Sequence, residues 1–419
     1  MRKVLFFLIL GLGISSFAQN QPAKTEQDST TQQKRISPFS SGYYRLGFFD
    51  ADLKYIIKYN NYEGLRLGFG GVTNERLSEK YKIGGYIARG FIDEKIKFSI
   101  GGSARLNKET NTWFNAYYID DLRELGSSTF LTDARVYSLF EPRLVNVTQF
   151  YKHRTWQSNI WHEFSKKIIS EFRLSKSHIK QTENYFYFDN DNLYNSYEIT
   201  ELTVSARFTS QANSITTEDG QIEYFDKIPK ISAQITQGLR GIFDGDFNYT
   251  KLGLKLDYLL KQKNLSATHF LLEGQVAFGE VPLTHLYHAY PNSPTKGSIL
   301  KRFSVAGRRT FETMYFGEFF SDKLSTLQVK HSFARFNFSN WLRPELVLIT
   351  RHALGSLNNK EKHIGPVFNT LDHFYSESGL EINKLLFGFG LSFAYRYGYY
   401  SLPDFDDNVS FKFTFYLKV

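Results

Sequence analysis

Residues 318–331 bring together side-chain types that could hydrolyse an ester. Glu318, Ser321 and Asp322 lie within five residues, and His331 follows about one strand later. An acyl hydrolase needs a serine beside a histidine base that an acid orients. However, no Gly-x-Ser-x-Gly elbow surrounds Ser321. We therefore interpret Glu318 and Asp322 as loop carboxylates that accept backbone N–H groups, and we expect neither catalytic residues nor an enzyme.

Two other patterns could bind a metal ion. His285 and His288 are spaced for one helical turn, but no carboxylate accompanies them at a useful spacing. Residues 189–192, Asp-Asn-Asp-Asn, begin like a calcium loop, yet Leu193 takes the next ligand position and Tyr194 takes that of the required glycine. Such residues also suit tight turns. We expect no metal and no cofactor site, with weak calcium binding by loops as the alternative.

The last twelve residues of the sequence alternate in polarity without a fault. A strand with this pattern has one apolar and one polar face. An aromatic-rich terminal strand resembles the closing strand and assembly signal of bacterial outer-membrane barrels. The residues of the expected signal are Phe411, Phe413, Phe415, Leu417 and Val419.

Six further segments alternate in the same way, and their polar faces repeatedly carry charges and glycines. Buried in a soluble sandwich, such faces would need partners, whereas in a barrel they face water inside and the apolar faces meet lipid. The six segments are 65–69, 95–100, 201–208, 231–236, 251–258 and 387–398. Arg66 and Arg396 are therefore candidate lumenal residues.

Eight less regular strands raise the count to fifteen, at 82–92, 111–118, 154–164, 167–176, 267–280, 324–336, 343–353 and 376–383. Bacterial barrels have even strand numbers. The sequence therefore predicts an all-β fold, a closed transmembrane antiparallel β-barrel of about 16 strands, with 14 as the alternative. Long polar stretches predict extracellular loops at 119–150, 182–196, 210–229, 282–310 and 355–375.

Composition supports a membrane barrel over a helical membrane protein or a nucleic-acid-binding protein. No stretch of 18 apolar residues follows the amino-terminal segment, and aromatic residues make up 17% of the chain. The formal charge of +9 comes from dispersed Lys and Arg. We expect a basic lumen or loops that face anions, and no nucleic acid partner.

The amino end predicts export. Residues 1–18 combine a basic start, a short apolar run and small residues before the expected cleavage after Ala18, which is typical of a signal peptide. Residues 19–40 are polar and predict a disordered periplasmic leader. The barrel would then occupy residues 41–419. The chain has no cysteine, which excludes a lipoprotein.

Several segments, in a consistent order, carry a resemblance to a known family. They are Glu63–Gly71, Gly84–Phe98, Phe311–Met314, Glu318–Lys323, Glu377–Leu380 and Tyr395–Gly398. Together they resemble an uncharacterised family of Gram-negative outer-membrane barrels described as carboxypeptidase-like regulatory-domain proteins, which is distantly similar to the barrel of the assembly-factor (surface antigen) superfamily. We expect neither the family's leading sandwich domain nor the periplasmic domains of assembly factors, because neither fits into residues 19–40. Arg240-Gly241 is similar to the turn that pins a loop in assembly-factor lumens, although an ordinary strand end is the favoured interpretation.

The resemblance implies an integral protein of the Gram-negative outer membrane. We expect a partner-binding, assembly-related or scaffold barrel, with a passive pore for small, anionic solutes as the alternative and a lipid hydrolase as the second. Expected partners are outer-membrane lipids and lipopolysaccharide, the assembly machinery during biogenesis, and other envelope proteins.

Overall fold

A computed structural model describes residues 42–131, 133, 142–216, 222–262, 266–294, 304–336, 339, 343–386 and 388–415. The expected signal peptide, the leader, Leu417 and Val419 lie outside these residues. Within the described ranges, no helix is long and apolar enough to cross a membrane. The described residues belong to one compact unit, Ile36–Val419.

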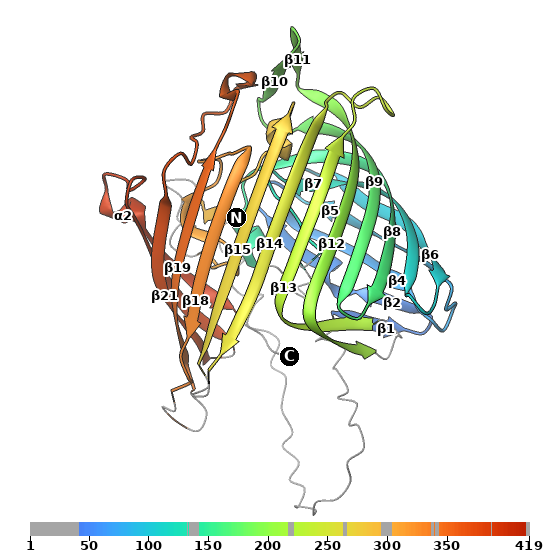
Figure 1. The fold of residues 1–419 in the computed structure, drawn as a ribbon, viewed down its shortest axis with the longest axis horizontal. Coiled ribbons are helices and arrows are strands. Elements are labelled where there is room, and N and C mark those ends of the chain that lie inside the picture. Colours follow the sequence, from blue (N-terminus) through green and yellow to red (C-terminus); the bar gives the residue numbers. More distant parts are fainter. Residues whose placement is uncertain are drawn as a thin grey trace, which may run out of the picture. The chain divides into compact units, whose positions relative to one another are not determined.

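One large antiparallel sheet dominates this unit and curls around a central axis (Figure 1). Its strands are β1 (Tyr43–Leu46), β2 (Phe49–Asp52), β3 (Ile57–Asn60), β4 (Gly64–Thr73), β5 (Tyr81–Gly90), β6 (Ile96–Asn107), β7 (Thr112–Glu124), β8 (Phe150–Ser165), β9 (Ile168–Gln181), β12 (Ser196–Thr216), β13 (Ile222–Gly238), β14 (Tyr249–Lys261), β15 (Ala267–Gly279), β18 (Lys323–Ser332), β19 (Glu345–Ser356), β21 (Tyr375–Leu386), β22 (Phe389–Tyr397) and β23 (Val409–Phe415). From β4 onward, each strand pairs with the next of these along the chain.

The smaller elements lie in the connections. They are the strands β10 (Phe186–Asp189), β11 (Asn192–Tyr194), β16 (Pro291–Ser293), β17 (Phe311–Tyr315) and β20 (His363–Ile364), the 3-10 turns η1 (Leu53–Tyr55), η2 (Pro142–Val145), η3 (Leu283–His285) and η5 (Lys360–Lys362), and the short helix α2 (Phe405–Asn408). Strands β10, β11 and β20 form a small sheet, and β16 pairs with β17 in parallel.

The all-β prediction is confirmed, and each of the fifteen predicted strands corresponds to a strand of the large sheet. The segment that sequence patterning missed lies at residues 43–60. There β2 pairs with the carboxyl end of β4 and β3 with its amino end, so the two act as one strand interrupted by η1. Counted in this way, the sheet has sixteen strand positions after the short β1.

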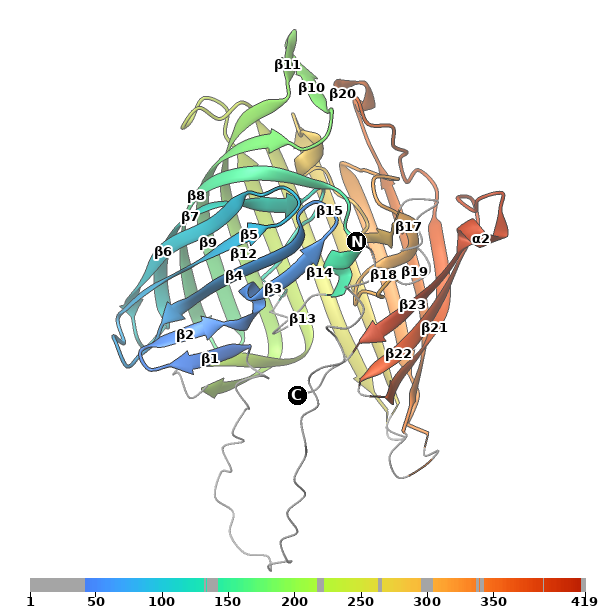
Figure 2. The ribbon, with the colours of Figure 1, turned by 180° about the vertical axis from the view of Figure 1, so that it is seen from behind.

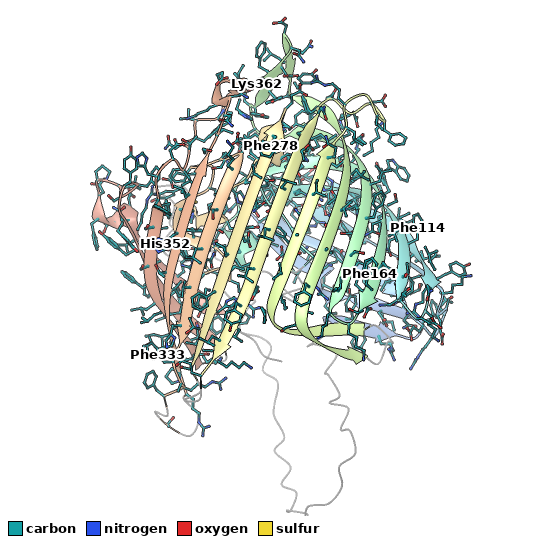
Figure 3. All side chains as sticks on the ribbon, viewed as in Figure 1. Phe114, Phe164, Phe278, Phe333, His352 and Lys362 are labelled. Carbon is teal, nitrogen blue, oxygen red and sulfur yellow. The ribbon has the colours of Figure 1, made fainter. Side chains whose placement is uncertain are left out.

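The two faces of the sheet follow the predicted alternation. On β14, Leu254 is 54% exposed on the outer face, whereas its neighbour Lys255 is 2% exposed inside. The same contrast holds on β22, between Phe393 outside and buried Arg396 inside. Figure 3 shows Phe114 and Phe164 on the outer surface of the curled sheet. The apolar face therefore points outward and the polar face inward.

Long and short connections gather at opposite ends of the sheet, as predicted, with one correction. Residues 210–216 and 222–229 are strand rather than loop, because β12 and β13 extend beyond the ends of the flanking strands β9 and β14 as a two-stranded hairpin. β12 pairs with β9 only as far as Phe208, and β13 pairs with β14 only from Lys230.

The predicted closure of the barrel is not observed. Among the described residues, β23 pairs only with β22 on one side, and no backbone ladder joins it to β1 or β3. Figure 2 shows β3 and β23 on the two sides of this interruption. We call this place the seam.

Candidate functional site

Residues 280–294 and 304–322, the described parts of the connection from β15 to β18, lie at the centre of the molecule. This stretch, here termed the lumenal segment, contains η3, β16 and β17, and every residue of these three elements is buried. Its apolar residues share one core with inward-facing tyrosines of the sheet. We had expected residues 282–310 to be an extracellular loop, and the described part of this stretch is instead packed inside the sheet.

Glu377 of β21 fixes β17 by three hydrogen bonds and pairs with Arg351 of β19. One carboxylate oxygen accepts the backbone N–H of Glu312 at 2.9 Å and the guanidinium of Arg351 at 2.7 Å. The other accepts the backbone N–H of Thr313 at 2.9 Å and its hydroxyl at 2.6 Å. Glu377 is completely buried, so these contacts replace the hydration of its carboxylate, and the Arg351 guanidinium is buried beside it.

Lys412 of β23 ties the same strand to the seam. Its ammonium donates to the carbonyl oxygens of Asn292 at 2.6 Å and Glu312 at 2.9 Å, and to the Glu312 carboxylate at 2.8 Å. All three donors of the ammonium group are thereby used. Burial opposes ionisation of Glu312, but Lys412 and Arg351 hold its pKa below the usual range.

Glu318 and Arg396, both singled out from the sequence, meet inside the sheet. The guanidinium of Arg396 donates to the two Glu318 oxygens at 3.2 and 2.7 Å, and it lies 4.7 Å from the ring centroid of Tyr375. Glu318 also accepts the backbone N–H of Tyr315 at 3.0 Å. Four of the segments that carry the family resemblance therefore meet around Glu377 and Glu318. They are Phe311–Met314, Glu318–Lys323, Glu377–Leu380 and Tyr395–Gly398.

A second cluster joins the lumenal segment to the opposite wall, and sequence analysis did not find it. Arg309 pairs with Asp133, and Lys255 contacts Asp133 at 2.6 Å and Glu273 at 2.9 Å. The inward positions of Lys255 and Glu273 follow from the alternation of β14 and β15. Their partners on the lumenal segment and on the connection after β7 could not be foreseen from periodicity.

The lumenal segment also covers part of the edge of the terminal strand. The backbone N–H of Ala306 donates to the carbonyl of Phe413 at 2.8 Å, and the N–H of Phe413 donates to Ser304 at 3.0 Å. The pairing is parallel and isolated. Residues 304–306, here called the strap, show that the seam edge of β23 accepts an extended chain.

The remaining predicted residues lie in separate places. Arg66 is an inward-facing residue of β4 that pairs with Asp121 at 2.7 Å. Arg240 lies in the turn after β13, pairs with Asp189 at 2.7 Å and is not in the lumen, so the favoured interpretation as a strand end holds. Asp322 is buried and accepts the backbone N–H of Asn358 at 2.9 Å, the role expected for a loop carboxylate.

The residues considered for ester hydrolysis or for metal binding do not come together in the described part of the chain. Ser321 is fully buried just before β18, whereas His331 lies at the far end of that strand, about 30 Å away at 3.3 Å per residue. His285 lies near Glu201 while His288 contacts Glu124, so the two histidines have different partners. Residues 189–192 form the tight turn between β10 and β11.

The small sheet of β10, β11 and β20 gives a pH-dependent prediction. His363 lies against Tyr185, whose hydroxyl is 3.0 Å from its ring, and burial together with Lys362 lowers the His363 pKa to about 4. The unfolded value is about 6.5. The folded state therefore loses stability as pH falls from about 6.5 towards 4. We expect faster hydrogen exchange in residues 186–194 at pH 5 than at pH 7.5, after correction for intrinsic rates.

The variant His363→Gln is the control for this effect, because it cannot titrate. Its exchange should not depend on pH in this range. An equal response in the variant and the natural chain would assign the effect to another group.

Comparison with known proteins gives one family and one fold. The profile of a family of unknown function, the DUF5686 C-terminal domain, matches residues 39–276. No curated protein matches the chain. BamA from Haemophilus ducreyi, solved without POTRA domains 1–3, superposes with a TM-score of 0.52 at 14% identity, over 85% of this chain and 68% of that one.

Two further solved structures are more distant. CdiB from Acinetobacter baumannii gives a TM-score of 0.40 at 12% identity, over 85% of this chain and 57% of its own. CdiB from Escherichia coli gives 0.43 at 11% identity, over 84% and 59%.

Proposed function

This chain belongs to the DUF5686 C-terminal domain family, and from this premise we propose that it is an outer-membrane barrel that binds strands of other envelope proteins at its seam. Its fold is that of the BamA barrel, which supports a place in the outer membrane of the cell envelope. The partner-binding role is an inference from the geometry of the sheet.

The observation that carries the proposal is the unpaired seam. Backbone groups that face hydrocarbon without a hydrogen-bond partner cost several kcal/mol each, so a bare edge inside a membrane is unstable. Strands β3 and β23 present such edges in the described residues. A strand from a partner would satisfy these groups by β-augmentation. The strap, already paired to Phe413, provides a precedent for such a strand.

Site-specific photo-cross-linking tests the proposal. A photoreactive phenylalanine analogue at Tyr59 of β3 or Phe411 of β23 should cross-link to other envelope proteins in intact cells. Val204, an exposed residue of β12 in the middle of the sheet, is the matched control. Adducts only between β3 and β23, or the same adducts from Val204, would contradict the proposal.

The passive pore makes a different prediction. The lumenal segment fills the interior with a shared apolar core and buried ion pairs. We therefore expect only small conductance for the natural chain in planar bilayers. Glu377→Ala removes four contacts to β17 and its neighbours and should raise conductance severalfold if the segment loosens. Large, steady conductance in the natural chain would instead favour the pore.

A further inference from the structure

A groove crosses the outer surface of β6, β7, β8 and β9. Its volume is about 560 Å³, within the range of small-molecule sites. The register across these strands places Gly102, Ala116, Ser158 and Leu174 side by side. Ala116, Ser158 and Leu174 of this row line the groove and form its floor, and two of these three side chains are small.

Larger side chains form one wall of the groove. This row contains Ile100, Tyr118 and Trp156. On the other side of the floor, outside the groove itself, the register places the exposed apolar residues Phe114, Ile160 and Phe172 next to one another. Phe243, from the turn after β13, contributes to one end. With strands about 4.8 Å apart, four strands give a floor roughly 14 Å across, enough for hydrocarbon chains lying side by side.

A basic patch lies at the groove's end nearest the long connections. Three cross-strand pairs of the β8–β9 hairpin project outward there, Lys152 with Lys180, Arg154 with His178, and Trp156 with Lys176. Lys152 and Lys180 carry like charges, and like charges directly opposite each other destabilise a strand pair. An anion between them would remove this cost.

Acidic neighbours neutralise the patch only in part. Arg154, 65% exposed, uses its Nε atom for Asp120 and leaves its two terminal amino groups without a partner among the described residues. Lys176 pairs with Asp244, and His178 with Glu198. Lys180 is exposed and makes no ion pair within the described part of the chain. A free guanidinium fork beside an unpaired lysine suits phosphate groups.

We propose that this groove and basic patch bind a phosphorylated, multiply acylated glycolipid. The acyl chains lie on the floor of small residues, beside the aromatic wall. The phosphates contact Arg154, Lys180 and Lys152. The proposal rests on the proposed location in the outer membrane, with the long connections on the outside of the cell. It does not depend on strand binding at the seam. A glycerophospholipid, with one phosphate and two chains, would leave part of this site empty.

The test uses the full chain purified in mild detergent, with lipid A and phosphatidylglycerol as probes and native mass spectrometry as the readout. We expect lipid A to bind at least tenfold more tightly than phosphatidylglycerol. Ala116→Trp fills the floor and should weaken binding of lipid A at least tenfold. Arg154→Gln with Lys180→Gln should reduce the preference for lipid A, because it removes the phosphate contacts.

Two controls separate binding from folding. Ala206→Trp changes an exposed residue of β12 outside the groove, and Lys261→Gln changes an exposed lysine at the opposite end of the sheet. Both should bind lipid A like the natural chain. Heat-modifiable mobility in gels shows that each variant is folded, and the charge variants alone decide the outcome if Ala116→Trp does not fold. Equal binding of the two lipids, or unchanged binding in the groove and charge variants, would overturn this proposal. Neither result would bear on the proposed binding of strands at the seam.

Discussion

Replacing Lys412 by methionine should destabilise the barrel by about 3–5 kcal/mol, the usual cost of removing one partner of a buried ion pair. The ammonium of Lys412 is buried and makes three hydrogen bonds to Asn292 and Glu312. Methionine restores the volume but none of the donors, so the Glu312 carboxylate and two carbonyls lose a partner. The free energy of unfolding in detergent, from urea titration, measures the change.

The lumenal segment should also become accessible to protease in this variant, since Lys412 holds both β16 and β17. Lys323→Met, at an exposed lysine of β18, is the matched control and should change the unfolding free energy by less than about 0.5 kcal/mol. A double variant, Lys412→Met with Glu312→Gln, should recover part of the loss, because it no longer buries an unpaired charge. A loss below about 1 kcal/mol in the single variant would show that the pair does not hold the segment.

The individual strands of this fold could be predicted from the sequence, but their long-range contacts could not. Alternation on β14 and β22 is a local signal, and it placed Lys255 and Arg396 on the inner face. The partner of Arg396, Glu318, is 78 residues away, and no periodicity links the two positions. Both residues were expected in the lumen or its loops, whereas their pairing required the structure.

Two segments were predicted wrongly, because neither shows a clear alternation of apolar and polar residues. Strands β2 and β3 have four residues each, with η1 between them, so neither is long enough for a clear alternation. Residues 282–310 were assigned to an outside loop as a long polar stretch. Yet residues 283–290 contain two leucines and two tyrosines, which is unusual for an exposed loop and is the signal that could have indicated burial.

Unpaired edges are the feature that sequence patterning could least foresee. A closed ladder was predicted because an open edge in hydrocarbon leaves backbone groups unpaired, and the structure has the sixteen positions without closure in its described residues. Strand number follows from local alternation, but closure depends on backbone groups of strands at opposite ends of the chain. The strap also opposes closure, since residues 304–306 occupy part of the edge of β23 that a closing strand would use.

Phe413→Asp should prevent stable insertion of the barrel, and Phe415→Asp should do the same. Phe413 lies on the outer face of β23 and is 36% exposed, between the inward-facing Lys412 and Thr414. A charge on the lipid face near the bilayer midplane costs up to about 2–4 kcal/mol for Arg or Lys and less for Asp, and the phenylalanine's own burial in lipid is lost as well. Absence of the faster-migrating unboiled form in gels, and absence from the outer-membrane fraction, measure the effect.

The same substitution at Phe405 separates the lipid face from a general effect of charge. Phe405 begins α2 in the connection before β23 and is 66% exposed, so Phe405→Asp should insert normally. Phe413 also bonds the strap, but only through its backbone N–H and carbonyl, which aspartate retains. A failure confined to Phe413→Asp and Phe415→Asp therefore reflects contact with lipid or with the assembly machinery. Normal insertion of both variants would mean that the outer face of β23 does not meet hydrocarbon.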